Sequence, residues 1–394
     1  MKAKKICVVT GSRSEYGILF TLLKMLKTDK NFELELIVTG THLSDKFGKT
    51  INAIINDGFK ISAKVEMNLD SASNESIGYA IGLGTINFTS VLTQLTPDLL
   101  ILQGDRFEML AAANAAVALN IPIAHIHGGE STEGVIDEQI RHSITKMSHL
   151  HFCATEFYKR RIIQMGENPK YVFNVGAPAL DLIKFVKYLP KQELEKKLKI
   201  PLNKNTALLT YHPVTLSKEI TIKEINNLIR FMHQIDLNWL ITYPNADNYN
   251  DIIIDKINEF SKTYKKGTVK IYKSLGNQMY FNVLKHIGFV IGNSSSGIIE
   301  VAMFKKPVIN IGIRQKGRIV PENVITVENV NVPDLFNAYK FIHSDSFIKK
   351  LKNLKNLYGN GNATKKIINI LHKISDFKKL LNKKFIDIQQ WKQN

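Results

Sequence analysis

Short apolar runs of strand length alternate with helix-length segments along this chain of 394 residues. The runs 4–10, 32–40 and 98–105 have the composition of strands, and segments such as 18–29 and 109–120 have helical spacing or an alanine-rich helical composition. Strands that alternate with helices in this way predict a parallel sheet with helices on both of its faces.

The alternation starts a second time after a charged segment that contains Pro190 and Pro201, with new strands beginning near 206. We therefore predict two Rossmann-like domains that face a cleft, an N-terminal domain over 1–185 and a C-terminal domain over 186–394. The lysine-rich segment 372–394 is interpreted as an amphipathic helix that can pack back on the N-terminal domain. Ligands of such folds bind where the carboxyl ends of the strands meet.

The net charge of +18 suggests nucleic acid as a partner. However, most of the excess is lysine spread along the chain, and no RNA-binding signature or zinc-finger spacing is present. We expect an anionic small ligand and no nucleic acid. No apolar run is long enough to span a membrane, and the first apolar stretch is too short for a signal peptide. With Cys7 and Cys153 both in apolar runs, the expected location is the cytoplasm.

Chemically active residues are concentrated where the predicted strands of the first half end. The turn after the first strand, "TGSRSEYG", lacks the G-x-G-x-x-G pattern of dinucleotide sites and carries Arg13 and Glu15 instead. Carboxylates that could act as acid and base across one substrate follow later strands. The candidates in this half are Arg13, Glu15, Asp105, Arg106, His127, Glu130, Asp137 and Arg141. Two simpler interpretations stay open, Asp105 as a helix N-cap and Glu138 as a solvated neighbour of Asp137.

The second half contains a segment typical of phosphate binding, "GNSSSGIIE", in which a strand ends in glycine and a serine-rich loop opens a helix. The alternative is an ordinary serine N-cap. Arginine side chains can bind a diphosphate with both arms, and a carboxylate one to two turns into the helix could accept the hydroxyls of a ribose. The candidates here are His212, Ser294, Ser295, Gly297, Glu300, Arg314 and Arg318.

Paired histidines on two strands raise the question of a metal. His125 and His127 are two residues apart, and His149 and His151 repeat this spacing. No paired cysteine or third ligand follows at a fixed distance, so we expect no metal and assign these side chains to hydrogen bonding. His212 differs because it ends a strand beside the predicted phosphate loop.

Together the motifs resemble the hydrolysing UDP-N-acetylglucosamine 2-epimerases of bacterial sialic acid and legionaminic acid biosynthesis. The resemblance runs from residue 10 to residue 318 and rests on "TGSRSEYG", "TGTHLS", "QGDRFE", "HIHGGESTEGVIDEQIRHSITKMSHLHF", "YHPVT", "GNSSSGIIE" and "GIRQKGR". It implies a GT-B-like fold, elimination of UDP to a 2-acetamidoglycal, and hydration to N-acetylmannosamine. It also implies no cofactor and a homo-oligomer, either a dimer or a tetramer.

The resemblance assigns roles to individual positions. Asp105 and Asp137 correspond to acid/base residues, and His212 to a catalytic histidine beside the diphosphate. Arg141 corresponds to a substrate-supporting residue, Arg13 to a ligand of the diphosphate, Ser294 and Ser295 to the phosphate loop, and Glu300 to the ribose ligand. Some relatives carry glutamate at the third position of the "HIH" strand, where this chain has His127. We place that catalytic role on Glu130, with His127 as the alternative.

Several rival functions share parts of this pattern. The nearest is the same reaction on UDP-2,4-diacetamido-2,4,6-trideoxyglucose, because residues that would contact C4 and C6 of the sugar are not identifiable. A GT-B glycosyltransferase would use the phosphate loop and Glu300, but it has less use for the carboxylates and needs an acceptor. A non-hydrolysing epimerase would release UDP-N-acetylmannosamine, and a basic nucleic-acid-binding protein would not need Asp105.

Overall fold

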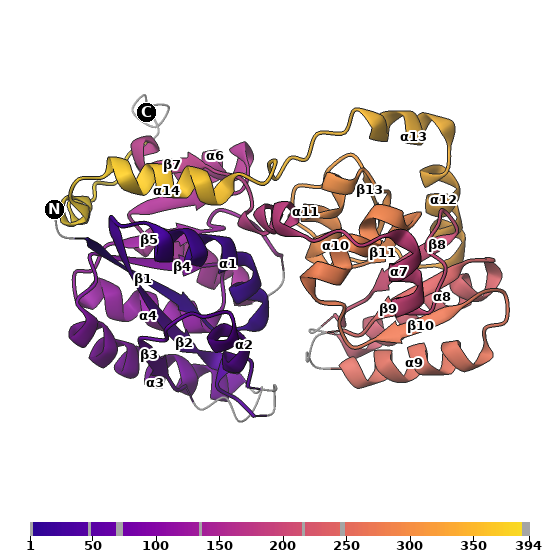
Figure 1. The fold of residues 1–394 in the computed structure, drawn as a ribbon, viewed down its shortest axis with the longest axis horizontal. Helices are drawn as coiled ribbons and strands as arrows, with labels where there is room; N and C mark the ends of the chain where they lie inside the picture. Colours follow the sequence, from indigo (N-terminus) through magenta and orange to yellow (C-terminus); the bar gives the residue numbers. More distant parts are fainter. Residues whose placement is uncertain are drawn as a thin grey trace. The chain divides into compact units, whose positions relative to one another are not determined.

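The structure, a computed structural model, describes residues 3–45, 49–67, 74–133, 136–214, 217–244 and 249–387. The chain divides into two compact units (Figure 1). The first unit is formed by Met1–Ser131, Val135–Leu182 and Tyr358–Asn394, and the second by Thr132–Gly134 and Ile183–Leu357. The first unit therefore receives the chain's last residues as well as its first.

The first unit is built around a parallel sheet, seven-stranded in its described part, in the order β3-β2-β1-β4-β5-β6-β7. Its strands are β1 (Lys4–Thr10), β2 (Phe32–Thr39), β3 (Ala63–Val65), β4 (Leu99–Gln103), β5 (Ile123–Ile126), β6 (Leu150–Cys153) and β7 (Val172–Asn174). Its α-helices are α1 (Arg13–Thr28), α2 (Ile51–Asn56), α3 (Asn74–Leu95), α4 (Phe107–Ala118), α5 (Ile136–Met147), α6 (Glu156–Gln164) and α14 (Ala363–Lys373). The strand order reverses between β1 and β4, which is the switch point where Rossmann folds bind ligands.

Strand β1 shows why the sheet is covered on both faces. Its residues are apolar at successive positions, and successive side chains of a strand point to opposite faces. Ile6 and Val8 pack in the cluster formed with α1 and α14, whereas Cys7 and Val9 pack in the cluster formed with α3, α4 and α5. All four side chains are fully buried. The predicted parallel sheet between two helical layers is therefore confirmed.

The second unit repeats this plan with a described sheet of six parallel strands in the order β10-β9-β8-β11-β12-β13. The strands are β8 (Thr206–Thr210), β9 (Asn238–Thr242), β10 (Val269–Tyr272), β11 (Phe289–Gly292), β12 (Val308–Ile311) and β13 (Val324–Val327). The α-helices are α7 (Lys191–Leu198), α8 (Lys218–Gln234), α9 (Asn250–Thr263), α10 (Gly276–His286), α11 (Ser295–Ile299), α12 (Val332–Ile342) and α13 (Asp345–Lys352). The switch point here lies between β8 and β11.

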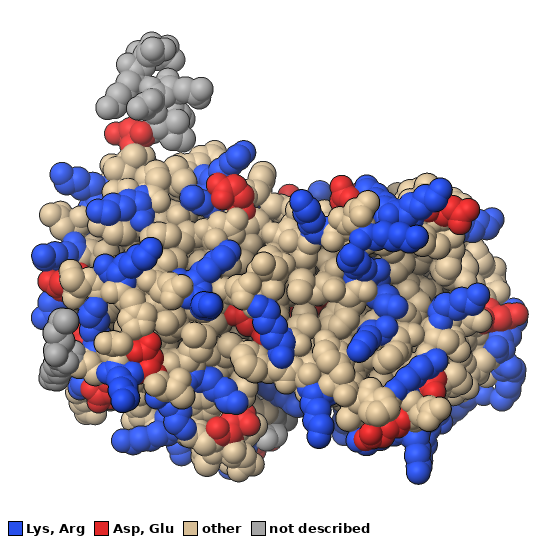
Figure 2. Space-filling model, turned by 45° about the horizontal axis from the view of Figure 1, so that its top comes forward, with Lys and Arg blue, Asp and Glu red and all other residues tan. Residues whose placement is uncertain are grey.

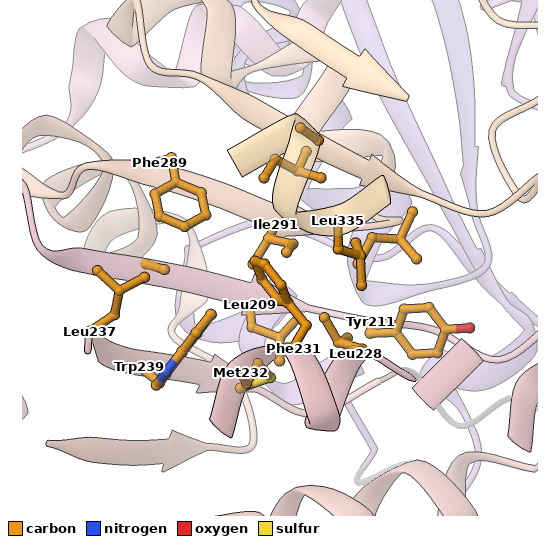
Figure 3. Packing of buried hydrophobic residues seen from close by; sticks show 14 of the residues in the cluster. Leu209, Tyr211, Leu228, Phe231, Met232, Leu237, Trp239, Phe289, Ile291 and Leu335 are labelled. Atoms are coloured by element: carbon orange, nitrogen blue, oxygen red, sulfur yellow. The ribbon is translucent and has the colours of Figure 1, made fainter. Parts of the chain in front are cut away.

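Large apolar side chains fill the core of the second unit. Leu209 of β8, Phe231 of α8 and Trp239 of β9 are fully buried and belong to one cluster (Figure 3). At the switch point the backbones of β8 and β11 lie close together. A Cβ placed on Gly292 would lie only 1.9 Å from the carbonyl oxygen of Thr210. Gly292 also has φ +136°, so only glycine fits where the predicted phosphate loop begins.

The prediction of a helix over 372–394 is wrong for residues 374–387, which are the part after Lys373 that the structure describes. Helix α14 ends there, Ile374 is extended, and the carboxylate of Asp376 accepts a hydrogen bond from the backbone N–H of Lys378 at 2.9 Å. This cap starts a short 3-10 turn, Phe377–Leu381, whose Phe377 is buried. Burial of apolar residues and a competing aspartate cap therefore end the helix early, and 388–394 lie outside the described residues.

Basic side chains are not confined to one patch of the surface. On the face that Figure 2 draws, Lys and Arg side chains are spread widely, with fewer Asp and Glu side chains between them. Within the residues that the structure describes, no helix has the length and apolarity needed to cross a membrane.

A buried carboxylate fastens α14 to the first unit. The two oxygens of Asp181 accept hydrogen bonds from the backbone N–H groups of Ala363 at 2.9 Å and Thr364 at 2.6 Å. The hydroxyl groups of Tyr158 and Tyr358 lie 3.1 Å apart close to this point. A negative charge that satisfies N–H groups at a helix N-terminus is stabilising.

We expect Asp181→Ala to lower the free energy of unfolding by about 2 kcal/mol, because two N–H groups at the start of α14 would lose their acceptor. Urea unfolding followed by circular dichroism measures this loss. Asp376→Ala is the matched control, since its cap is exposed and serves only a short turn. Equal losses in the two variants would show that Asp181 does not hold α14.

Candidate functional site

The turn after β1 is closed by two hydrogen bonds that both involve Glu15. The backbone N–H of Glu15 donates to the Ser12 hydroxyl at 3.4 Å, and the backbone N–H of Gly11 donates to the Glu15 carboxylate at 2.7 Å. The arrangement is related to a capping box, but the Glu15 carboxylate bonds back to Gly11, the residue before the N-cap Ser12. Glu15 is buried, whereas the side chain of Arg13 is exposed. Of these two predicted ligand residues, Glu15 supports the turn and Arg13 points to solvent.

A second carboxylate lies beneath the same turn. Glu108 is fully buried and accepts hydrogen bonds from Arg106 Nε and Nη2, each at 3.2 Å. The Glu108 carboxylate also packs closely against the loop after β2. A Cβ placed on Gly40 of that loop would lie only 2.8 Å from Glu108 Oε1. Burial, followed by repulsion from Glu108, raises the pKa of Glu15 to about 8. The buried carboxylates of Glu15 and Glu108 thus contact the loops after β1, β2 and β4.

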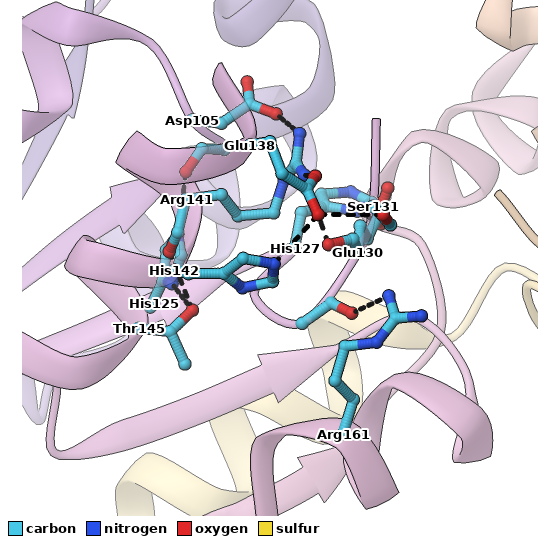
Figure 4. A network of polar contacts seen from close by, with 12 residues as sticks. Asp105, His125, His127, Glu130, Ser131, Glu138, Arg141, His142, Thr145 and Arg161 are labelled. Carbon is cyan, nitrogen blue, oxygen red and sulfur yellow. Dashed lines mark hydrogen bonds and ion pairs between the residues drawn. The ribbon is translucent and has the colours of Figure 1, made fainter. Parts of the chain in front are cut away.

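Arg141 of α5 is the centre of the next group of contacts (Figure 4). Its side chain is only 1% exposed and forms an ion pair with Asp105. Its Nη1 donates to the Glu138 carboxylate at 2.7 Å and to the backbone oxygen of Glu130 at 3.1 Å. One buried cation therefore ties α5 to the loops that follow β4 and β5. The N-cap interpretation of Asp105 is wrong, because Arg106 occupies that position.

Two neighbouring acidic residues of α5 have different surroundings. Burial, together with repulsion from Asp105, raises the pKa of Asp137 to about 6, which is close to the range where a group can both accept and donate protons. Glu138 is not a solvated neighbour. It accepts hydrogen bonds from Arg141 and from the Ser131 hydroxyl at 2.8 Å, and it lies 3.0 Å from His142 Nε2. The sequence pattern gave no sign of these contacts.

His127 and Glu130, the two alternatives for the third catalytic position, contact each other directly. His127 Nδ1 lies 2.6 Å from Glu130 Oε1, and both side chains are buried. His127 has φ +66°, so the chain bends sharply as it leaves β5. The other ring nitrogen, Nε2, is buried without a hydrogen-bond partner in the described structure. The two residues therefore form one pair.

The other histidines of these strands are held by hydrogen bonds. His125 Nε2 lies 2.7 Å from the backbone oxygen of Gly104 and its Nδ1 lies 3.2 Å from the Thr145 hydroxyl. Burial lowers the pKa of His125 to about 3, so the ring is neutral. His151 Nε2 lies 3.0 Å from Glu167. Among the residues that the structure describes, no three His, Cys, Asp or Glu side chains are grouped to hold a metal ion.

In the second unit, the ends of β8 and β11 are joined through one asparagine. Asn293 accepts a hydrogen bond from the backbone N–H of His212 at 2.7 Å and donates one to its carbonyl oxygen at 2.8 Å. Arg314 and Gln315 donate to the backbone oxygen of Asn293 at 3.2 Å and 2.9 Å. Burial, and then the Arg314 cation, lowers the pKa of His212 to about 3. Asn293 and Gln315 were missed, although Asn293 directly follows a predicted strand.

The serine-rich segment forms the turn between β11 and the short helix α11. Ser294 occupies the N-cap position but its side chain makes no capping bond, so the interpretation as an ordinary serine cap is not supported. Gly297 is buried, and Glu300 ends the helix, where burial raises its pKa. Ser295 is the first residue of α11, Arg318 lies on the loop after β12, and both are partly buried.

Each unit thus gathers most of its predicted residues at the carboxyl ends of its own strands, on and beside the switch point. In the first unit the gathered groups are Asp105, Arg106, His127, Glu130, Asp137 and Arg141. In the second unit they are His212, Ser294, Ser295, Gly297, Glu300 and Arg314. The first set offers carboxylates for proton transfer, and the second offers groups suited to an anion.

Comparison with known proteins gives matches over nearly the whole chain. Residues 24–372 match the model of a protein family described as UDP-N-acetylglucosamine 2-epimerase. The GDP/UDP-N,N′-diacetylbacillosamine 2-epimerase (hydrolyzing) of Campylobacter jejuni is 40% identical, over 98% of this chain and 100% of that protein. The UDP-N,N′-diacetylbacillosamine 2-epimerase (hydrolyzing) of Legionella pneumophila is 37% identical, over 96% and 98%. The polysialic acid biosynthesis protein P7 of Escherichia coli is 39% identical, over 98% and 97%.

The fold is also similar to solved structures. The crystal structure of UDP-GlcNAc 2-epimerase from Neisseria meningitidis bound to UDP-GlcNAc superposes with a TM-score of 0.79 at 19% identity, and covers 94% of this chain and 100% of that one. The predicted GT-B-like fold of two Rossmann-like domains is therefore confirmed.

The raised pKa of Glu15 predicts a pH dependence of stability. Its folded-state pKa of about 8 lies above the ordinary glutamate pKa of 4.5, so the folded protein binds the proton more tightly and stability falls as pH rises between these values. Glu15→Gln stays neutral, so we expect it to lose less stability than wild type between about pH 5 and about pH 8, by on the order of 2 kcal/mol. Thermal unfolding at both pH values measures this difference.

The control is Glu193→Gln on α7, where the carboxylate is 45% exposed and bonded only to a surface lysine. This variant should follow the wild-type pH dependence. If Glu15→Gln followed it too, Glu15 would not carry a buried proton.

Proposed function

This chain belongs to the UDP-N-acetylglucosamine 2-epimerase family, and from that premise we propose that it is a hydrolysing 2-epimerase of a UDP-sugar. Its products are UDP and the free sugar inverted at C2. The observation that carries the proposal is the acid/base group at the end of the first sheet, where Asp137 lies beside the Asp105–Arg141 ion pair. Inversion at C2 requires one group that removes a proton and another that returns a proton on the opposite face.

The substrate we favour is UDP-N,N′-diacetylbacillosamine, which is UDP-2,4-diacetamido-2,4,6-trideoxyglucose. Two relatives at 40% and 37% identity are named for this sugar nucleotide. The second candidate is UDP-N-acetylglucosamine, which the sequence motifs suggested first and which the family description names. Both sugars carry the 2-acetamido group at the reacting centre, so the same residues serve either substrate.

The reaction proceeds in two stages. In the first, a base removes the proton from C2 while the C1–O bond to UDP breaks, which leaves a 2-acetamidoglycal and UDP. In the second, water adds at C1 and C2 receives a proton on the opposite face. We assign Asp105, held by Arg141, and Asp137, whose pKa is raised to about 6, to the two proton transfers at C2.

We assign the third catalytic function to the pair His127–Glu130 rather than to Glu130 alone. The 2.6 Å contact between His127 Nδ1 and Glu130 Oε1 joins the two groups. Glu130 orients the ring, and Nε2 is the atom of the pair that has no partner in the described structure. A histidine oriented by a carboxylate is suited to activate the attacking water.

The loops of the second unit are assigned to UDP. Ser294, Ser295 and Gly297 open α11 toward a phosphate, and Glu300 is assigned to the ribose hydroxyls. His212 is neutral without ligand and would donate a hydrogen bond to the diphosphate as UDP leaves, with the Arg314 cation beside it. Arg13 of the first unit is assigned to the diphosphate, and no redox cofactor is required.

Proton NMR in deuterated water tests the function directly. The protein is incubated without acceptor with UDP-N,N′-diacetylbacillosamine and, in parallel, with UDP-N-acetylglucosamine. We expect UDP together with a free sugar of manno configuration that carries deuterium at C2, and faster turnover of the diacetamido sugar. Epimerised sugar still attached to UDP would indicate the non-hydrolysing reaction instead. No turnover of either substrate would contradict the proposal and favour a glycosyltransferase.

Substitution of the two aspartates tests the acid/base assignment. We expect Asp105→Asn and Asp137→Asn each to lower kcat by about 10²–10⁴-fold, because an amide cannot accept or return the C2 proton. UDP affinity, measured by calorimetry, should stay close to wild type. Asp236→Asn is the control, because that carboxylate is 76% exposed and pairs only with Lys266. Normal turnover in either active-site variant would contradict the assignment.

A further inference from the structure

Helix α10 packs against the segment that follows the predicted phosphate loop. Phe281 of α10 is buried, and its ring stacks on that of Phe304 with the ring centroids 6.0 Å apart and an interplanar angle of 16°. Phe304 ends a short 3-10 helix, Val301–Phe304, which begins directly after Glu300. Close packing in a protein interior holds such side chains in single positions. Helix α10 therefore has a fixed place beside the segment that carries Glu300.

Tyr280, the residue before Phe281 on α10, contacts the serine-rich segment itself. Its hydroxyl is hydrogen-bonded to the hydroxyl of Ser296. The backbone N–H of Glu300 donates to the carbonyl oxygen of Ser296 at 2.9 Å, so these two residues are one helical turn apart and lie on the same face. All three side chains are partly buried and keep part of their surface open to a ligand. Neither Tyr280 nor Ser296 is among the residues assigned above to UDP.

Electrostatic interactions link the same three side chains. Burial raises the pKa of Glu300, and a hydrogen bond from the Ser296 hydroxyl acts in the opposite direction. Burial, followed by the negative charge of Glu300, raises the pKa of Tyr280, so its hydroxyl keeps its proton. A hydroxyl has one hydrogen to donate and can accept another. When Ser296 donates to Glu300, Tyr280 is therefore the donor to Ser296.

We propose that Tyr280 is a positioning residue for ribose recognition, because through Ser296 it holds the Glu300 carboxylate in the orientation that accepts both ribose hydroxyls. The inference rests on the proposed function, where Glu300 is assigned to the ribose. A carboxylate can rotate about the bonds of its side chain, and a fixed hydrogen bond restricts this rotation before the ligand binds. The site then prefers ribonucleotides to 2′-deoxyribonucleotides to a degree that depends on Tyr280.

A purely structural contact between α10 and α11 predicts a different result. Loss of such a contact would loosen the whole serine-rich segment, and nucleotides with and without the 2′-hydroxyl would be affected alike. Loss of a positioning contact instead weakens the interaction with the ribose hydroxyls selectively. The ratio of the dissociation constants of 2′-deoxy-UDP and UDP separates the two roles.

Calorimetric titration of the full chain with UDP and with 2′-deoxy-UDP measures this ratio. We expect wild type to bind UDP at least about 10-fold more tightly, because the deoxy sugar leaves a charge-assisted hydrogen bond unmade. Tyr280→Phe should lower the ratio to about 3 or less. The matched control, Tyr272→Phe, also removes one tyrosine hydrogen bond of the second unit, to the backbone oxygen of Leu198 at 3.1 Å, and should keep the wild-type ratio.

Two results would overturn the proposal. One is a wild-type ratio in Tyr280→Phe, which would leave the hydroxyl of Tyr280 without a role in ribose binding. The other is a wild type that does not distinguish the two nucleotides, which would show that the carboxylate of Glu300 does not bind the ribose.

Ser296→Ala tests the route and does not depend on the folding of the Tyr280 variant. The change removes one hydroxyl and introduces the residue with the highest helix propensity. We expect the same fall in the ratio, and no further fall in the double variant Tyr280→Phe/Ser296→Ala, because both changes break one chain of hydrogen bonds. An unchanged ratio in Ser296→Ala, or losses that multiply in the double variant, would contradict a route through Ser296.

These titrations are independent of turnover. If the NMR incubation showed no reaction while the ratio responded to Tyr280→Phe, the assigned reaction would be wrong and the ribose inference would stand. If turnover were as expected while the ratio ignored Tyr280→Phe, the ribose inference alone would be wrong.

Discussion

The geometry of the candidate site in the first unit depends on the contacts of the Arg141 guanidinium group. It is a buried cation, and a buried cation without partners is strongly destabilising. Its partners come from three separate places in the sequence, Asp105 after β4, Glu130 after β5 and Glu138 on α5 itself. Movement of any one of these segments would break a bond to this buried cation. Their relative positions, and with them the separation of the carboxylates, are therefore fixed before any ligand binds.

The two units place different kinds of groups at the same point of the same strand order. In the first unit the switch point is surrounded by charged side chains whose pKa values are set by burial and by each other, which suits proton transfer. In the second unit the corresponding point is built from backbone and amide groups, with Asn293 joining two strand ends and Gly292 allowing them to approach. Such groups hold an anion without taking up its protons. This difference between the two units follows from which residues stand at the carboxyl ends of their strands.

The sequence predicted the parts of the fold that are local. Long apolar runs identified the central strands, and their ends indicated the candidate site residues, because the carboxyl ends of parallel strands lie at one edge of the sheet. The edge strands β3 and β13 were missed, although strands of the same length such as β7 and β11 were predicted. The contacts that define the site are between residues far apart in the chain, such as Arg141 and Asp105. No local pattern distinguishes a ligand-binding Glu15 from one that caps its own turn.

The absence of lysine from 65 to 145 has a physical consequence near the candidate site. A mobile lysine beside Asp137 would favour its ionised form and lower its pKa, which would remove the property that suits it to acid/base work. The cations of this stretch, Arg106 and Arg141, are instead fixed by carboxylates. The raised pKa of Asp137 therefore depends as much on which cations are held away from it as on its burial.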